Sequence, residues 1–267
     1  MPELPQNQQE TTVTELVKSE IIGRVLVITI NRPEARNALT YDTSFALAAA
    51  LDQLDANNDL TVGILTGQGN TFCSGMDLKE FAKTQRRAVV PGRGLGGLCE
   101  APPQKPLIAA VEGYALAGGC ELALACDLIV SAENAQFGLP EVKRGLVPGS
   151  GGMLRLPQRL PYHVAMEILL TGDMIPAQRA HQLGLVNQLT EPGKALEAAL
   201  KLADRIAANG PLAVRTVKQV VVQSQDWRQE DMFALQQPRM AHIFASEDAK
   251  EGATAFAEKR APVWKGK

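Results

Sequence analysis

Apolar positions in the first half of the chain form short runs typical of buried β-strands, and segments with helical periodicity separate these runs. Residues 25–30 are apolar except for Thr29, which indicates a strand buried on both faces. A turn near Gly23 and Arg24 joins this strand to an earlier one in a hairpin. The pattern predicts strands at residues 13–18, 25–30, 61–66, 107–111, 128–131 and 136–137, and helices at 42–54 and 118–126. Strands that alternate with short helices favour an α/β fold of repeated units.

The last third of the chain is almost entirely helical in pattern. Helices are predicted at residues 162–170, 176–183, 193–207, 211–223, 229–242 and 247–258. The helix at 211–223 has an apolar face formed by Leu212, Val214, Val217, Val220 and Val221. A face this rich in apolar side chains is not left in water, so we expect it to pack on the main domain or on a partner subunit. Self-association is therefore expected.

The pattern divides the chain into a polar N-terminal tail at residues 1–12, a core domain at 13–205 and a C-terminal helical region at 206–267. Within the core domain, residues 83–104 lack clear periodicity and are predicted to form a mobile loop. Gly92-Arg93-Gly94-Leu95-Gly96-Gly97 in this loop matches the spacing G-x-G-x-x-G. No strand leads into it and no βαβ unit surrounds it, so we interpret it as a flexible loop and not as a dinucleotide site.

Composition excludes several classes of function. The 267 residues are 45% apolar and can fill the core of one large domain. A net charge of −2 and a pI near 6.0 give no general attraction to nucleic acid, and no RNA- or DNA-binding motif is present. The first dozen residues lack the features of a secretion signal, and no apolar run approaches the ~20 residues that span a bilayer. These features predict a cytoplasmic protein that binds neither membranes nor nucleic acid.

Cysteine and histidine usage narrows the chemistry further. Cys73, Cys99, Cys120 and Cys126 form no C-x-x-C pair, which favours reduced, buried thiols. The three histidines are scattered, and no metal-ligand spacing can be assembled from them. We therefore expect neither a metal site nor serine–histidine catalysis.

Two glycine-containing segments that end in a carboxylate carry the candidate chemistry: Gly118-Gly119-Cys120-Glu121 and Phe137-Gly138-Leu139-Pro140-Glu141. If Gly118 begins a helix, its free N–H lies at the positive end of the helix dipole, and no Cβ blocks a ligand. A second such amide is expected upstream in residues 71–78 (TFCSGMDL), where a glycine precedes a helix that starts near Asp77. Two amides and two glutamates predict a site that activates a carbonyl with an acid and a base in place.

Five segments of this chain carry a specific family resemblance. They are residues 31–39 (NRPEARNAL), 72–79 (FCSGMDLK), 105–115 (KPLIAAVEGYA) and the two glutamate segments. Their order and spacing resemble the crotonase superfamily, also called the enoyl-CoA hydratase/isomerase family, from about Val13 onward. The resemblance implies a spiral of ββα units and a C-terminal α-helical region that covers the site and builds trimers or dimers of trimers.

The resemblance also implies residue roles. The backbone amides of Met76 and Gly118 would form the oxyanion hole for a thioester enolate. Glu121 would orient and deprotonate water, and Glu141 would exchange the proton at the adjacent carbon. No metal and no tightly bound cofactor is implied, because coenzyme A arrives as part of the substrate.

Binding of the coenzyme A moiety is expected near the same segments. Basic residues that could flank the nucleotide are Arg32, Arg36, Lys79 and Lys83. Phe256 and Lys259 match positions where the family's C-terminal helix meets the ligand, sometimes across a subunit boundary. The expected contacts with the acyl-CoA substrate are Ala35, Arg36, Ala38, Ser74, Met76, Asp77, Leu78, Lys79, Gly118, Phe256 and Lys259.

The glutamate pair favours reversible syn hydration of a 2-enoyl-CoA to a 3-hydroxyacyl-CoA. Residues 139–157 and 246–266 are most similar to the carnitinyl-CoA dehydratase (crotonobetainyl-CoA hydratase) branch, which is an alternative. Isomerase, decarboxylase and thioester hydrolase reactions use the same oxyanion hole and remain open, as does a non-catalytic acyl-CoA-binding or RNA-associated role. The sequence leaves open the acyl group, the pathway, the choice between trimer and hexamer, and which residues at 83–104 line the pocket.

Overall fold

The computed structural model describes residues 15–267, and the polar tail expected at residues 1–12 lies outside them. A six-stranded sheet forms its centre in the order β1-β2-β3-β6-β8-β11. Its members are β1 (Val17–Ile22), β2 (Val25–Ile30), β3 (Val62–Gly67), β6 (Leu107–Val111), β8 (Leu128–Ala132) and β11 (Gln188–Thr190). β1 pairs antiparallel with β2, and every other neighbouring pair is parallel. The hairpin turn at Gly23 and Arg24 is confirmed.

The first strand lies later in the chain than the sequence pattern placed it. The prediction of a strand at residues 13–18 is wrong, because β1 begins at Val17, and residues 13 and 14 lie outside the described part of the chain. Only Val17 of this edge strand is buried, so β1 carries little apolar signal to mark its ends. The strands predicted at 25–30, 61–66, 107–111, 128–131 and 136–137 are confirmed to within one residue at either end.

A second sheet has three strands in the order β10-β9-β7. They are β7 (Tyr114–Leu116), β9 (Gln136–Gly138) and β10 (Ile175–Pro176). β9 pairs parallel with β7 and antiparallel with β10. β6 of the large sheet is followed by β7 of the small sheet, and β8 is followed by β9 in the same way. Each pair then leads into a helix, α3 (Gly118–Ala125) after β7 and the short 3-10 helix η2 (Pro140–Arg144) after β9. This repetition is the expected spiral of ββα units.

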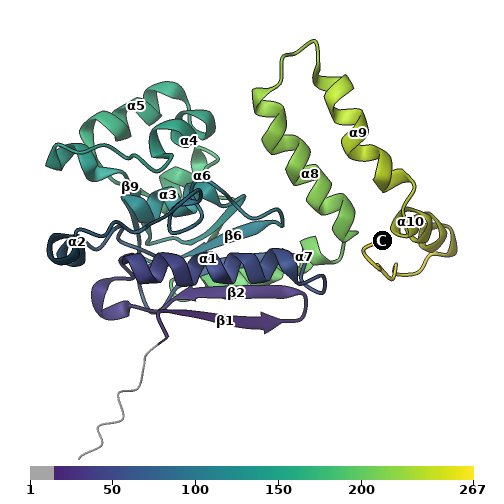
Figure 1. Ribbon diagram of the computed structural model, residues 1–267, viewed down its shortest axis with the longest axis horizontal. Coiled ribbons are helices and arrows are strands. Elements are labelled where there is room, and N and C mark those ends of the chain that lie inside the picture. The colour runs from purple at the N-terminus through teal and green to yellow at the C-terminus, as the bar shows by residue number, and fades with distance from the viewer. Residues whose placement is uncertain (1–14) are drawn as a thin grey trace, which may run out of the picture.

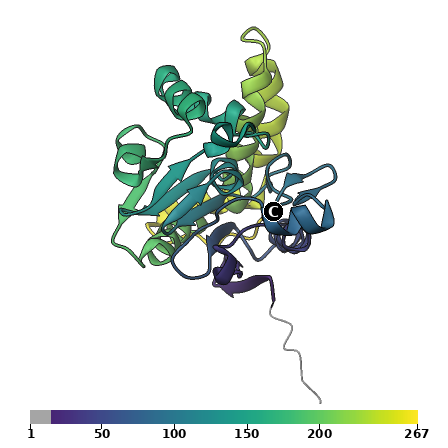
Figure 2. The same cartoon turned by 90° about the vertical axis from the view of Figure 1, so that its left-hand side faces the viewer.

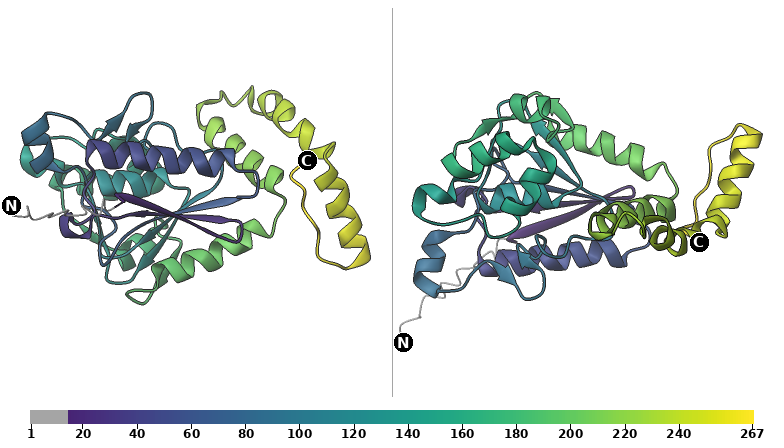
Figure 3. Two further views of the ribbon diagram at one scale, coloured as in Figure 1. Left: turned by 60° about the horizontal axis from the view of Figure 1, so that its bottom comes forward. Right: turned by 90° about the horizontal axis from the view of Figure 1, so that it is seen from above.

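Helices cover both faces of the large sheet. α1 (Tyr41–Ala56) lies along one face and α7 (Ala195–Ala207) along the other, as the edge-on view in Figure 3 shows. Leu26 and Ile28 of β2 point into the core that contains α1, whereas Val25 and Val27 point into the core under α7. Burial on both faces is the reason why β2 is apolar along its length.

Within the part of the chain that the structure describes, the main domain contains five further helices, of which α6 packs on β9 and β10 of the small sheet. They are η1 (Pro33–Ala35), α2 (Leu78–Thr84), α4 (Gly152–Arg159), α5 (Tyr162–Thr171) and α6 (Ala177–Gln182). The helices predicted at 42–54, 118–126, 162–170, 176–183 and 193–207 are confirmed, with ends that shift by up to two residues. β7, β10 and β11 were not predicted, because each has only two or three residues.

Residues 83–104 do not form the irregular loop that the sequence predicts. β4 (Val89–Val90) and β5 (Gly94–Leu95) pair as a short antiparallel hairpin, and Leu98 and Cys99 after it are buried. A Cβ on Gly97 would lie 2.5 Å from the Cβ of Ala48, so this segment packs tightly on α1. The G-x-G-x-x-G match lies in this hairpin and not between a strand and a helix, as expected.

The C-terminal helices α8 (Pro211–Gln223), α9 (Met232–Phe244) and α10 (Glu247–Glu258) are confirmed, and the short 3-10 helix η3 (Ser224–Asp226) follows α8. They extend away from the two sheets in Figure 1 and lie behind the main domain in Figure 2. On α8, Val217 is 63% exposed and Val221 58% exposed. The main domain of the same chain therefore leaves much of this apolar face uncovered. No helix within residues 15–267 has the length and apolar character needed to cross a membrane.

Candidate active site

The Gly118 amide lies at the first position of α3, where no backbone carbonyl of the helix can accept from it. The preceding residue Ala117 has φ 49° and ψ −126°, a conformation that residues with a side chain rarely adopt. Ala117 N donates to Gly138 O over 2.9 Å, which ties this strained residue to β9. Strain of this kind persists where the surrounding structure enforces it, and here it sets the direction of the Gly118 N–H.

The Met76 amide lies close to Gly118 in space. Leu39 N donates to Gly75 O, and Asp77 N donates to Leu39 O, each over 2.8 Å, so the Met76 N–H points away from this bridge. A Cβ on Gly75, whose φ is 101°, would lie 3.2 Å from Gly118 N. Among the described residues, neither Met76 N nor Gly118 N donates to a protein acceptor. The structure thus brings two free amides together, as the sequence predicted.

Glu121 lies in the first turn of α3 and is only 3% exposed. Its Oε1 accepts from Ser150 N over 2.6 Å and from Gly152 N over 2.9 Å. Burial raises the pKa of this carboxyl above its ordinary value, and the amides of Gly152 and Ser150 and the charge of Arg155 oppose that shift. These contacts fix the orientation of the side chain and favour its ionised form.

Glu141 lies in η2 and has a different environment. Its Oε2 is buried without a hydrogen-bond partner among the described residues. Burial, together with the nearby charge of Glu121, raises the pKa of Glu141 to about 7. An unpaired carboxylate oxygen in an apolar setting favours the protonated form. The two carboxyls therefore suit opposite roles at neutral pH, with Glu141 as the acid and Glu121 as the base.

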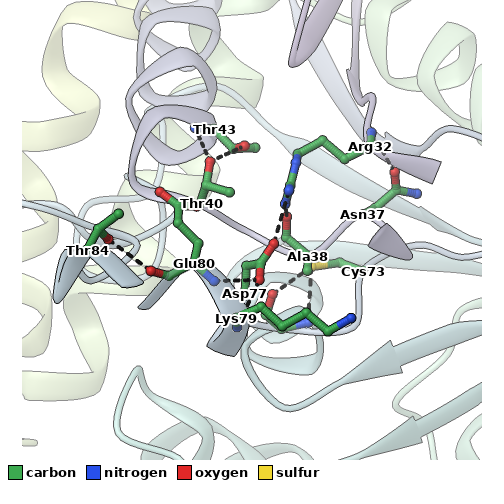
Figure 4. Close-up of polar contacts among 11 residues, drawn as sticks. Arg32, Asn37, Ala38, Thr40, Thr43, Cys73, Asp77, Lys79, Glu80 and Thr84 are labelled. Carbon is green, nitrogen blue, oxygen red and sulfur yellow. Dashed lines mark hydrogen bonds and ion pairs between the residues drawn. The ribbon is translucent and has the colours of Figure 1, made fainter. Parts of the chain in front are cut away.

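Arg32 and Asp77 form a network that holds α2 against the segment after η1 (Figure 4). Asp77 Oδ1 accepts from Lys79 N and Glu80 N, each over 3.1 Å, and so caps α2. Arg32 Nη2 lies 3.0 Å from Asp77 Oδ2, and Arg32 Nη1 donates to Ala38 O. Arg32 and Asp77 thus bind each other and nearby backbone atoms, and these contacts position the neighbouring backbone.

The residues expected to hold coenzyme A fall into two groups. The first group, from residues 35–38 and 74–83, lies together. Ser74 N donates to Arg36 O over 3.1 Å, and the network of Figure 4 joins Ala38 to Asp77 through Arg32. In this group the exposed side chains, which are free to meet a large anion, are Arg36, Leu78, Lys79 and Lys83, whereas Ala35, Ser74 and Met76 are partly buried and Ala38 is buried.

The second group lies elsewhere in the chain. Phe256, on α10, is 87% exposed, and Lys259 forms the C-cap of that helix. α10 lies at the opposite end of the molecule from α2 in Figure 1. Within one chain, the structure therefore does not bring Phe256 and Lys259 to the glutamates.

Two backbone donors of the site were not identified from the sequence. The amides of Ser150 and Gly152, at the turn before α4, contact Glu121 directly. A backbone donor has no residue type of its own, and the only signal is the glycine-rich run of this turn, which lets the backbone approach a carboxylate closely. Within residues 15–267, no cluster of three or more His, Cys, Asp or Glu side chains could hold a metal ion.

Comparison with known proteins identifies the family. The enoyl-CoA hydratase/isomerase family matches residues 20–267. The chain belongs to this family. The crystal structure of the enoyl-CoA hydratase EchA1 from Mycobacterium marinum is 59% identical, covers 95% of this chain and all of that one, and superposes with a TM-score of 0.93. The crotonase-like α/β fold with its C-terminal helices is thereby confirmed.

Relatives in this family carry two kinds of name. The enoyl-CoA hydratase EchA19 of Mycobacterium tuberculosis is 41% identical over 90% of this chain and 92% of its own length. The carnitinyl-CoA dehydratase of Salmonella typhi is 43% identical over 92% of this chain and 96% of its own length. Both names describe hydro-lyases.

Proposed function

We propose that this protein is an enoyl-CoA hydratase that adds water reversibly and in syn geometry to a 2-enoyl-CoA thioester. The observation that carries the proposal is the pairing of a buried carboxyl, that of Glu121, with the partly buried carboxyl of Glu141, in unlike environments. Glu121 accepts from two amides, whereas Glu141 has a buried oxygen without a partner and a pKa raised to about 7. An acid and a base at one site can add the two parts of water to one double bond.

The reaction follows from these groups. Met76 N–H and Gly118 N–H donate to the thioester oxygen, which becomes negative as water attacks. Ionised Glu121 takes a proton from the water while the water oxygen bonds to Cβ of the substrate. The electron pair of the double bond moves toward the carbonyl, and protonated Glu141 delivers its proton to Cα. One proton then returns from Glu121 to Glu141, so both carboxyls regain their starting states.

Substrate binding completes the proposal. The adenine nucleotide would lie near Arg36, Lys79 and Lys83, and the thioester would reach the amides of Met76 and Gly118. The uncovered apolar face of α8 supports a homotrimer or a dimer of trimers. Phe256 and Lys259 of one subunit would then meet the ligand of another. We propose a cytoplasmic location, with acyl-CoA as the small-molecule partner.

Carnitinyl-CoA dehydratase activity is the second candidate. Its support is the 43% identity to the carnitinyl-CoA dehydratase of Salmonella typhi, beside 41% identity to EchA19 and 59% identity to EchA1. The acyl group of crotonobetainyl-CoA differs from that of crotonyl-CoA by a quaternary ammonium, which a hydratase pocket must accommodate with aromatic or acidic groups. Substrate preference therefore decides between the two.

Loss of the conjugated-thioester absorbance tests both candidates, with crotonyl-CoA and crotonobetainyl-CoA supplied in parallel. We expect turnover by the wild type, and a loss of at least 100-fold in kcat in Glu121→Gln and in Glu141→Gln, because each variant lacks one proton-transfer partner. Wild-type levels of hydration in either variant would contradict the mechanism. Binding of both thioesters without turnover would instead support another reaction of the family or a binding role.

A further inference from the structure

Arg155 lies on α4, and its side chain runs back along the first turn of that helix. Arg155 N donates to Gly151 O over 2.8 Å, and Arg155 Nη2 donates to Cys99 O over 2.6 Å. Nη1 lies so close to Gly151 that a Cβ on that glycine would overlap it. One guanidinium therefore joins the turn before α4 to the buried segment after β5.

The turn that Arg155 contacts is the one that binds Glu121. Ser150 N and Gly152 N, on either side of Gly151, both donate to Glu121 Oε1. Gly151 has φ 104°, in the left-handed region that strains any residue with a side chain. The direction of both donors thus depends on this backbone conformation and on the guanidinium packed against it.

The guanidinium also borders a cavity of about 460 Å³ between α3, α4 and α8. The cavity is lined in part by Pro103, Ala125, Arg155, Arg159, Lys218 and Val222. Truncation of Arg155 would extend this empty space to the turn. The turn would lose the packing of the guanidinium, and the segment after β5 would lose the hydrogen bond at Cys99 O. The turn is then free to move, because an empty space supplies no contacts in place of the guanidinium.

The charge of Arg155 acts on Glu121 as well. The titratable groups that face this carboxyl are Glu141 on η2, Cys120 on α3 and Cys99 after β5, and the charge of Glu121 raises the pKa of each of them. Each of them gains negative charge when it ionises, and a neighbouring negative charge disfavours ionised Glu121. Arg155 is positive and opposes this effect.

We propose that Arg155 is a positioning residue for the hydration reaction, which braces the turn at residues 150–152 so that Glu121 stays aligned to take a proton from water. This inference rests on the proposed hydratase function, in which Glu121 is the base. Arg155 acts through Glu121 and the turn, and its positive charge favours the ionised form of that carboxyl.

The test compares Arg155→Met and Arg155→Lys with the matched control Arg159→Met. Arg159 lies on the same helix and borders the same cavity, but it donates to Leu124 O and not to the turn. We expect Arg155→Met to lower kcat for crotonyl-CoA by about 10- to 100-fold with KM changed by less than about threefold, because misplacement of a catalytic group costs rate more than binding.

The pH profile adds a result that a purely structural role would not give. The acid limb of kcat/KM should move to higher pH in Arg155→Met, stay in place in Arg159→Met, and return toward the wild-type position in Arg155→Lys, which restores the charge. Equal losses of kcat in Arg155→Met and Arg159→Met, with no movement of the acid limb, would overturn the inference.

A readout without turnover separates this inference from the hydratase function. Carbon-13 NMR of glutamate carboxyls, with Glu121 assigned from its loss in Glu121→Gln, should show a higher pKa for Glu121 in Arg155→Met. An unchanged titration in a folded Arg155→Met variant overturns the role of Arg155, whereas a wild type that hydrates no enoyl-CoA overturns the proposed function. If Arg155→Met does not fold, Arg155→Lys decides: a lower kcat supports the role, and wild-type kcat contradicts it.

Discussion

At the scale of single residues, Glu141 couples catalysis to pH. Its pKa, raised to about 7 by burial, lies above the value of about 4.5 expected for an unfolded chain. The stability that protonated Glu141 provides is therefore complete at low pH and is lost as pH rises through about 7. We predict that Glu141→Gln raises Tm relative to the wild type at pH 8 and has a smaller effect at pH 5.

Differential scanning calorimetry at both pH values measures this difference. Glu100→Gln is a control, because that side chain is exposed to solvent. An equal change in Tm at pH 5 and pH 8 for Glu141→Gln would mean that Glu141 titrates normally in the folded protein. That result would also remove the physical basis for its role as the acid at neutral pH.

Gly119 is the residue at which close packing sets the separation of the two amides of the proposed oxyanion hole. A Cβ at this position would overlap the carbonyl oxygen of Cys73, a backbone atom that no rotamer change can move. In Gly119→Ala, α3 must therefore shift relative to the segment that carries the Met76 amide. Loss of one oxyanion donor costs about 2.7–4 kcal/mol of transition-state stabilisation, so we predict a fall in kcat of at least about 100-fold.

Steady-state kinetics with crotonyl-CoA checks this prediction, and Gly149→Ala is the matched control. The nearest atom to a Cβ on Gly149 would be Val147 O at 3.9 Å, an ordinary contact. We expect the control to retain most of its activity. A Gly119→Ala enzyme with wild-type kcat would show that the two amides need not keep this separation.

At the scale of elements, the position of α2 depends on Asp77. Burial raises the pKa of this carboxyl, but hydrogen bonds from Glu80 N and Arg32 and the charge of Arg32 outweigh that effect, so the pKa is lowered overall. The stability it provides is therefore present at neutral pH and is lost as pH falls through the lowered pKa. We predict that Asp77→Ala costs about 0.5–2 kcal/mol of unfolding free energy at pH 7, the usual cost of losing an N-cap.

Urea unfolding at pH 7 measures this cost. Kinetics with crotonyl-CoA should also show a higher KM for Asp77→Ala, because α2 carries Lys79 and Lys83 of the proposed nucleotide site. Asp42→Ala is the control, since its ion pair with Arg86 is exposed on both sides and contributes little. Equal effects of the two substitutions on stability and KM would show that Asp77 does not position α2.

Elements also differ in how far the sequence alone reveals them. β2 and β3 were predictable because both faces are buried and their residues are apolar, whereas β1 exposes all but Val17 and its start was misplaced. Glu121 and Glu141 were found through the glycines near them. The amides of Ser150 and Gly152 were missed, because a hydrogen bond to backbone leaves no side chain to recognise, and the hairpin of β4 and β5 is too short for periodicity to show.

At the scale of the whole molecule, the extended C-terminal region predicts that each site is completed by a neighbouring subunit. Phe256 on α10 is 87% exposed, α10 lies far from α3 in Figure 1, and α8 exposes an apolar face. In a closed ring of subunits, α10 of one chain can reach the site of the next. We predict that Phe256→Asp weakens substrate binding at the site of a neighbour, which raises KM.

Mixed oligomers test this arrangement, because each of two defective chains can supply what the other lacks. In trimers of co-expressed Glu121→Gln and Phe256→Asp chains, about one quarter of the sites would combine an intact Glu121 with an intact Phe256 from the neighbour. Activity at low crotonyl-CoA should therefore exceed the sum of the two parent variants. If Phe256 instead serves its own chain, no site in the mixture regains both residues, and the mixed oligomers will show only the average activity of the parents.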